Sequence, residues 1–233
     1  SYTKGLLGED QRATVERQVA QATAARAAWA QRLLQTPVER ALSDAEIMAR
    51  VHDVAPTLFG DNCAVCHGAD ARGAPGYPNL RDDVWIWGGA PEEISETLRV
   101  GVNAPHADTR VSQMLAFGRD KLLSYDDVRA AAAYVHSFSN PRTRVSRAVP
   151  TRGREVFAGN CAVCHGETGQ GVRAVGGPDL TDDEWLYGGD EETIFASAWG
   201  GRHGVMPAWE ARLSEADRRL LTLYLLDLQE QPR

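Results

Sequence analysis

The chain has 233 residues, of which 43% are hydrophobic, so it can form two modest domains or one large domain with buried cores. Its formal net charge of −7 argues against nucleic acid as a partner, because phosphate binding requires clustered Lys and Arg, and it favours a basic protein partner. No run of about 18 apolar residues occurs, and the opening lacks the apolar core of a signal peptide, so we expect the chain as given neither to span a membrane nor to export itself.

Residues 1–42 are expected to form an N-terminal segment with one peripheral helix. The stretch 11–34 is rich in Ala and contains neither Gly nor Pro, which predicts an exposed helix that ends before Pro37. Ser43 and Glu46 have the spacing of a capping box and predict the start of the next short helix.

All four cysteines lie in two identical pentapeptides, Cys-Ala-Val-Cys-His. This spacing lets two thiols bind the two vinyl groups of one haem while the adjacent His reaches the iron. A zinc site or a redox dithiol also uses two cysteines at this spacing, but neither requires a His directly after the second Cys. The motifs therefore predict two covalently attached haem c groups, held by Cys63, Cys66 and His67 and by Cys161, Cys164 and His165.

The similarity of the two halves extends well beyond the pentapeptides. Aligned positions include Pro78-Asn79-Leu80 with Pro178-Asp179-Leu180, Trp85 with Trp185, and Gly88-Gly89 with Gly188-Gly189. This collinearity indicates a duplicated unit. We expect a first domain over 43–140, a linker over 141–150 and a second domain over 151–233.

Each copy contains signals for two helices after its motif. Pro91 and Asp190 are expected to begin the first of these, and two glutamates follow each of them, which suits the positive end of the helix dipole. Ser124 and Ser214 are expected to cap the second, which closes each copy. The sequence therefore predicts an all-α fold of two tandem class I cytochrome c domains, each built around one covalently bound haem. An N-terminal helix is expected to precede the two domains.

The histidines of the two motifs are the expected proximal ligands of the irons. The second ring nitrogen of each should donate to a fixed acceptor, which sets the tautomer. The carbonyls of Pro78 and Pro178, in the repeated turn, are the candidates, although both residues can also be ordinary loop prolines.

The sixth ligand of each iron separates an electron carrier from a haem that activates small molecules. Met48 lies on a helix before the first motif and suits packing. Met206, in a loop of the second copy, is the expected ligand of the second haem. Met114 lies in the corresponding loop of the first copy, where an insertion also contains His106, so the first haem is left with two candidates. Three arginines near these loops are candidates either to neutralise haem propionates or to serve as ordinary surface or core residues: Arg99, Arg110 and Arg202.

With these residues assembled, the chain resembles the dihaem cytochrome c subunit, of the CcoP or FixP type (subunit III), of cbb3-type cytochrome c oxidases. The resemblance covers nearly the whole chain and rests on the two Cys-Ala-Val-Cys-His-Gly motifs, the Pro-Asx-Leu turns, the Trp and Gly-Gly positions, the loop 202–207 and the opening 2–8. In that family the opening follows a transmembrane helix. The chain, which begins at Ser1 rather than Met, therefore looks like a soluble periplasmic part of a protein anchored in the bacterial inner membrane.

The resemblance implies an electron-transfer subunit that is not catalytic alone. Such a subunit takes electrons from a donor cytochrome c or a bc-type complex and passes them, through a monohaem cytochrome c subunit, toward the haem-copper centre that reduces oxygen. The second domain, with 14 acidic and 8 basic residues, would suit a basic donor. Two alternatives stay open: a freestanding dihaem electron carrier, and a dihaem peroxidase, which requires an iron that can open a coordination position.

Overall fold

The structure, a computed structural model, describes residues 11–139 and 151–231, and the regular secondary structure in these two ranges is helical. The helices are α1 (Gln11–Gln35), α2 (Val38–Ser43), α3 (Ala45–Asn62), α4 (Ala64–His67), α5 (Pro91–Val100), α6 (Tyr125–Ser139), α8 (Thr151–Asn160), α9 (Ala162–His165), η1 (Arg173–Val175), α10 (Glu191–Gly200) and α11 (Glu215–Glu230). Loops with isolated β-bridges connect them. The all-α prediction is confirmed in these ranges, and the predicted linker 141–150 and the opening 2–8 lie outside them.

The predicted helix starts are present at Pro91 and after Ser124, Asp190 and Ser214. The Asp190 carboxylate accepts the N–H of Thr193 at 3.0 Å, and the Ser214 hydroxyl accepts the N–H of Asp217 at 3.1 Å. Each cap satisfies one of the N–H groups that a helix leaves free at its start.

Helix α3 begins one residue later than the predicted capping box. Ser43 is the last residue of α2, where its hydroxyl donates to the carbonyl of Glu39 at 3.1 Å. Asp44 caps α3 instead, because its carboxylate accepts the N–H groups of Glu46 and Ile47 at 3.0 and 3.1 Å. An ionised carboxylate is a stronger acceptor than a hydroxyl, which explains the shift.

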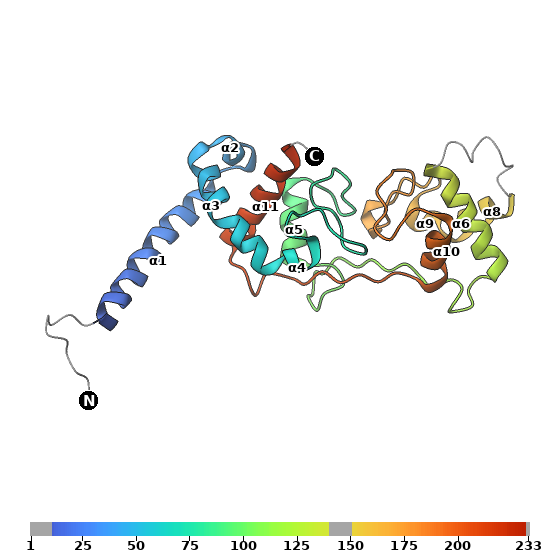
Figure 1. The fold of residues 1–233 in the computed structure, drawn as a ribbon, viewed down its shortest axis with the longest axis horizontal. Helices are drawn as coiled ribbons and strands as arrows, with labels where there is room; N and C mark the ends of the chain where they lie inside the picture. The colour runs from blue at the N-terminus through green and yellow to red at the C-terminus, as the bar shows by residue number, and fades with distance from the viewer. Residues whose placement is uncertain (1–10, 140–150, 232–233) are drawn as a thin grey trace, which may run out of the picture.

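Helix α1 projects away from the other helices (Figure 1). Val15 and Val19, on its outer part, are more than half exposed. Only its last turns join a core, where Leu33 is fully buried and Trp29 packs beside it. No helix in the described residues combines the length and the apolar character needed to cross a membrane.

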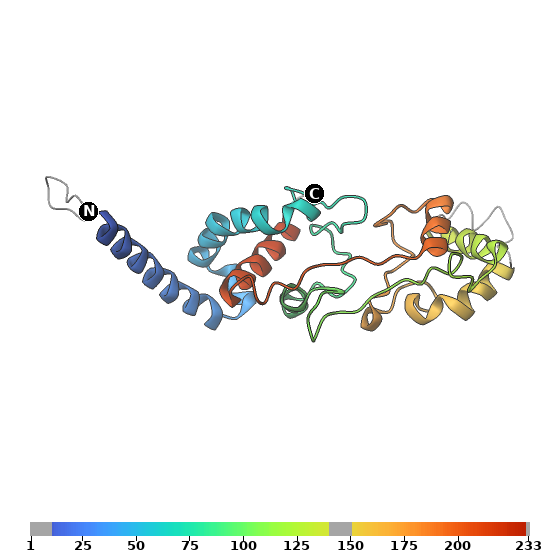
Figure 2. The ribbon, with the colours of Figure 1, turned by 90° about the horizontal axis from the view of Figure 1, so that it is seen from below.

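The remaining helices form two units that lie side by side (Figures 1 and 2). In the first unit α11 packs against α3 and α5, and α4 carries the first cysteine motif. In the second unit α6 packs against α8 and α10, and α9 carries the second motif. We refer below to residues 38–112 and 203–231 as the first unit, and to residues 113–139 and 151–202 as the second unit.

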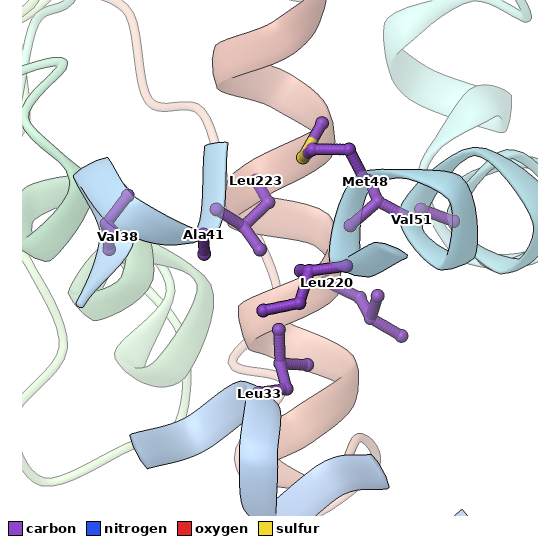
Figure 3. Close-up of a cluster of buried hydrophobic side chains, with 9 residues drawn as sticks. Leu33, Val38, Ala41, Met48, Val51, Leu220 and Leu223 are labelled. Atoms are coloured by element: carbon purple, nitrogen blue, oxygen red, sulfur yellow. The ribbon is translucent and has the colours of Figure 1, made fainter. Parts of the chain in front are cut away.

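Helix α11 lies at the centre of the first unit. Leu220 and Leu223 of α11 are 2% and 0% exposed, and they pack between Leu33 of α1, Ala41 of α2 and Val51 of α3 (Figure 3). Met48 is buried in the same cluster, which agrees with its predicted packing role.

Helix α6 has the same position in the second unit. Val135 of α6 packs with Phe157 of α8 and Ile194 of α10. The rings of Tyr134 and Phe138 meet Phe157 edge to face at 5.5 and 5.4 Å between centroids, a favourable geometry for aromatic pairs.

The closing helices of the two sequence repeats are therefore exchanged. The sequence predicted that each copy would be closed by its own last helix, but α6 closes the unit of the second motif and α11 closes the unit of the first. The repeats are similar, so either helix offers a suitable apolar face to either unit, and exchange of equivalent elements has a low free-energy cost. Sequence similarity between the copies therefore could not reveal which helix closes which unit.

The segments that lead into α6 and α11 run between the units in opposite directions (Figure 2). Val102 exchanges two backbone hydrogen bonds of 2.9 Å with Met206. Met114 exchanges two backbone hydrogen bonds with Arg202, of 3.0 and 3.1 Å. These pairs fix the position of both methionine loops.

Candidate haem-binding sites

The first cysteine motif forms one helical turn at the end of α3. The N–H of Cys63 donates to the carbonyl of Phe59 at 2.7 Å, and the N–H of His67 donates to that of Cys63 at 3.0 Å. Cys63, Cys66 and His67 consequently lie on a single turn. Gly68, with φ of +77°, ends this turn in a conformation that residues with a side chain rarely adopt.

The second motif repeats this geometry. The N–H of Cys161 donates to Phe157 at 2.8 Å, and the N–H of His165 donates to Cys161 at 2.9 Å. All four cysteines are free thiols that are partly buried. Burial, followed by the charge of the second cysteine of each motif, raises the pKa of Cys63 and of Cys161 to about 11, so these two thiols are protonated at neutral pH.

Both motif histidines are held by the predicted proline carbonyls. The Nδ1 of His67 donates to the Pro78 carbonyl at 3.0 Å, and the Nδ1 of His165 donates to the Pro178 carbonyl at 3.0 Å. This tautomer leaves each Nε2 with a lone pair to bind iron. Burial lowers the pKa of both imidazoles, more than the hydrogen bond to the proline carbonyl raises it, so the neutral form needed for a metal ligand is favoured.

Met206 lies in the first unit, which differs from its expected pairing with the second haem. Its half-buried side chain packs against the cluster that contains Phe59, Leu98 and Trp209, and Cys63 packs against the same cluster. The sequence order of the loops suggested the other pairing. The exchange of the closing segments is the reason for the difference, because Met206 travels with α11.

Met114 correspondingly lies in the second unit. Its backbone pairs with Arg202, and the next residues bond to α10 through Phe117 and Arg119, whose N–H groups donate to Ala198 and Trp199 at 3.0 Å. A cavity lies beside this loop, lined by Met114, Ala116, Arg119, Gly200, Gly201, Arg202 and His203. Each unit thus has one motif histidine and one methionine loop from the other sequence repeat.

His106 has both ring nitrogens engaged elsewhere. Its Nε2 lies 2.9 Å from the Glu210 carboxylate, and its Nδ1 accepts the N–H of Asp108 at 3.0 Å. Of the two candidates for the first haem, Met114 lies in the other unit and His106 has both ring nitrogens engaged, whereas Met206 lies in the unit of His67.

Of the three candidate arginines, Arg110 best matches an acidic group of a cofactor. Arg99 is already paired with three carboxylates, those of Glu96, Asp108 and Glu210. The Nε of Arg110 is buried without a hydrogen-bond partner, one of two such side-chain atoms in the described part of the chain. A haem propionate at Arg110 would satisfy this donor.

The residues of each unit fit a covalently bound haem. Two thiols and a histidine share one turn, the histidine presents a neutral Nε2, and an apolar cluster borders the motif. A helical unit with these features is a c-type cytochrome domain, and the chain contains two of them.

Comparison with known proteins agrees with this class for both halves. The family model described as "Cytochrome c" matches residues 55–139. The family model described as "Cytochrome C oxidase, cbb3-type, subunit III" matches residues 148–225. The chain belongs to the family of cbb3-type cytochrome c oxidase subunits that are named FixP or CcoP.

Curated relatives cover nearly the whole chain. The "Cbb3-type cytochrome c oxidase subunit FixP" of Bradyrhizobium sp. (strain ORS 278) is 42% identical over 98% of this chain and 78% of its own length. The "Cbb3-type cytochrome c oxidase subunit CcoP" of Azospirillum brasilense is 40% identical over 98% of this chain and 79% of its own. The subunit CcoP of Cereibacter sphaeroides is 40% identical over 96% of this chain and 77% of its own.

Proposed function

We propose that the chain carries two haem c groups and transfers electrons within a cbb3-type cytochrome c oxidase. One haem is held by Cys63, Cys66, His67 and Met206, and the other by Cys161, Cys164, His165 and Met114. The observation that carries this proposal is the presence, in each unit, of one motif histidine and one methionine loop. Bound haem supplies an iron that alternates between the ferrous and ferric states.

Histidine and methionine together fill the two axial positions of an iron, and a filled coordination sphere favours electron transfer over binding of small molecules. A thioether ligand raises the reduction potential. With one methionine in each unit, both haems are expected to have fairly high potentials that are similar to each other. A pair of this kind suits a relay.

We propose a basic cytochrome c or a bc-type complex as the electron donor. The exchange of helices changes where the acidic charge lies, because α11 brings its carboxylates to the first unit. The first unit has 17 acidic and 9 basic residues, whereas the second has 12 and 7. The sequence suggested that a basic donor would bind to residues 151–233. We now propose that the donor binds to a surface to which the first unit contributes more negative charge than the second.

The proposed acceptors are the other oxidase subunits, including a monohaem cytochrome c, that lead to the haem-copper centre where oxygen is reduced. The names of the relatives, which are subunits of such an oxidase, support this assignment. We place the chain on the periplasmic side of the bacterial inner membrane, anchored in the full-length protein by the N-terminal helix that the family resemblance implies.

The ligand assignment is tested with haem-loaded protein. Mass spectrometry should find two haems per chain. Met206→Ala and Met114→Ala should each remove about half of the weak red absorption band that a methionine-iron bond gives to oxidised haem, because each changes one of two sites. His106→Ala is the matched control and should leave the band intact.

Other results would contradict the assignment. If neither methionine substitution changed the band, the axial ligands would be different residues. High-spin iron and turnover of peroxide in the unmodified protein would favour a dihaem peroxidase instead.

A further inference from the structure

The two units meet at the loops that hold the motif histidines (Figures 1 and 2). The loop 73–78 ends at Pro78, whose carbonyl accepts from His67, and the loop 171–178 ends at Pro178, whose carbonyl accepts from His165. We refer to these as the first and second proximal loops, and to the place where they meet the opposite unit as the joint. Both loops contact an aromatic residue of the other unit.

Tyr187 of the second unit lies against the first proximal loop. A Cβ atom added at Gly76 would lie 3.3 Å from the Tyr187 ring, so the ring covers the backbone at this point. The N–H of Gly76 also donates to the carbonyl of Leu186 at 2.7 Å. The backbone held in this way lies two residues before Pro78.

Trp87 of the first unit makes the reciprocal contact. A Cβ atom added at Gly176 would lie 2.3 Å from the Trp87 ring, which shows that Gly176 is closely covered. The carbonyl of Gly176 accepts the hydroxyl of Ser112 at 3.0 Å. Trp87 and Tyr187 occupy equivalent positions in the two sequence repeats, so the contact has an approximate two-fold symmetry.

An arginine lies over each ring. The guanidinium carbon of Arg202 is 3.9 Å from the centroid of Tyr187, and that of Arg110 is 5.2 Å from the centroid of Trp87. Such contacts restrict the motion of both partners. A further ion pair between the units, Arg173 with Glu93 at 3.3 Å, limits their relative movement.

We propose that Tyr187 and Trp87 are positioning residues that act across the joint: Tyr187 holds the first proximal loop and the hydrogen bond to His67, and Trp87 holds the second proximal loop and the hydrogen bond to His165. The acceptor of the Nδ1 proton tunes the strength of a histidine ligand. Each aromatic residue thereby sets the potential of the haem in the opposite unit, a consequence that rests on the proposed function. The joint makes the two sites interdependent.

The test is hydrogen exchange of the haem-loaded protein, read by mass spectrometry for peptides that cover each proximal loop. Tyr187→Ala should speed exchange in the first proximal loop roughly three- to thirtyfold, the range expected for loss of a contact of this kind, and should leave the second loop unchanged. Trp87→Ala should do the reverse. Tyr187→Phe should behave as the unmodified protein, because the ring and its contacts are retained.

Tyr77→Ala is the matched control. Tyr77 is an aromatic residue of the first proximal loop whose side chain is 45% exposed, so its removal should leave the second loop unchanged and disturb the first far less than Tyr187→Ala. In redox titrations, Tyr187→Ala and Trp87→Ala should each shift the reduction potential of one of the two haems. The haem whose potential shifts should differ between the two variants.

The inference is overturned if either alanine substitution loosens the proximal loop of its own unit, if both loosen the same loop, or if neither changes exchange. A mass without haem would instead refute the proposed function. Hydrogen exchange of the two proximal loops can also be measured in protein without haem. Failure of this inference can therefore be distinguished from failure of the proposed function.

Discussion

The backbones of Val102 and Met206 are joined by two hydrogen bonds of 2.9 Å, although the two residues come from different sequence repeats. This pairing places the methionine loop of the second repeat on the unit that contains His67. The corresponding pairing of Met114 with Arg202 places the other methionine in the unit of His165. The following predictions test this exchange and its consequences.

Leu223→Ala should destabilise the first unit. Leu223 of α11 is fully buried against α2 and α3, and a large-to-small substitution of this kind costs about 2–5 kcal/mol. Hydrogen exchange should become faster in α3 and stay unchanged in α8. Val135→Ala in α6 is the counterpart and should loosen α8 instead. Faster exchange in α8 on Leu223→Ala would show that α11 closes the second unit.

Gly101→Ala should disturb the methionine loop of the first unit. Gly101 has φ of +68° and ψ of −170°, a conformation that only glycine adopts without strain, and an added Cβ would lie 2.4 Å from the Met206 carbonyl oxygen. We expect a loss of about 1–3 kcal/mol and a weaker methionine-iron band in haem-loaded protein. Gly60→Ala is the control, because nothing lies within 4 Å of its added Cβ. An unchanged band and melting temperature for Gly101→Ala would contradict the close contact between Gly101 and the Met206 backbone.

Asp127→Asn should lower the melting temperature at neutral pH and have less effect in acid. The Arg152 guanidinium, 2.7 Å away on α8, lowers the pKa of the Asp127 carboxyl. A carboxyl whose pKa is lowered by folding contributes stability above its ordinary value of about 3.9, and this contribution is lost as the pH falls through the lowered value. Asp126→Asn, on the exposed side of the same turn, is the control. A difference that persisted in strong acid would exclude the ion pair as its cause.

Association with a basic donor cytochrome should slow as salt is added, because salt screens the attraction between opposite net charges. Stopped-flow measurement of electron transfer at several ionic strengths checks this. An acidic cytochrome is the control and should react faster, or at the same rate, when salt is added. Salt-independent rates with the basic donor would argue against electrostatic docking.

Local features were predictable from the sequence because they depend on neighbouring residues. The cap at Asp190 and the helix that starts at Pro91 follow from residue type and from the glutamates after them. The proline carbonyls that hold the motif histidines follow from the repeated turn. The predicted cap Ser43 was wrong by one residue, because the neighbouring Asp44 is also a good cap and caps α3 instead.

The pairing of segments far apart in the chain could not be predicted in the same way. Met206 and Met114 occupy similar loops in similar repeats, so nothing in their local sequence favours either unit. His106 likewise lacks a local signal that would reveal its bond to Glu210. The division of acidic charge between the units could not be predicted for the same reason, because α11 belongs to the second repeat in sequence and to the first unit in space.

The position of α11 also has a consequence for biosynthesis. A ribosome produces the first cysteine motif before the second, but the helix that closes the unit of the first motif, α11, follows the second motif in the chain. Met206, which packs against the same cluster as Cys63, also follows the second motif. The first unit can therefore complete its packing only after both motifs have been synthesised.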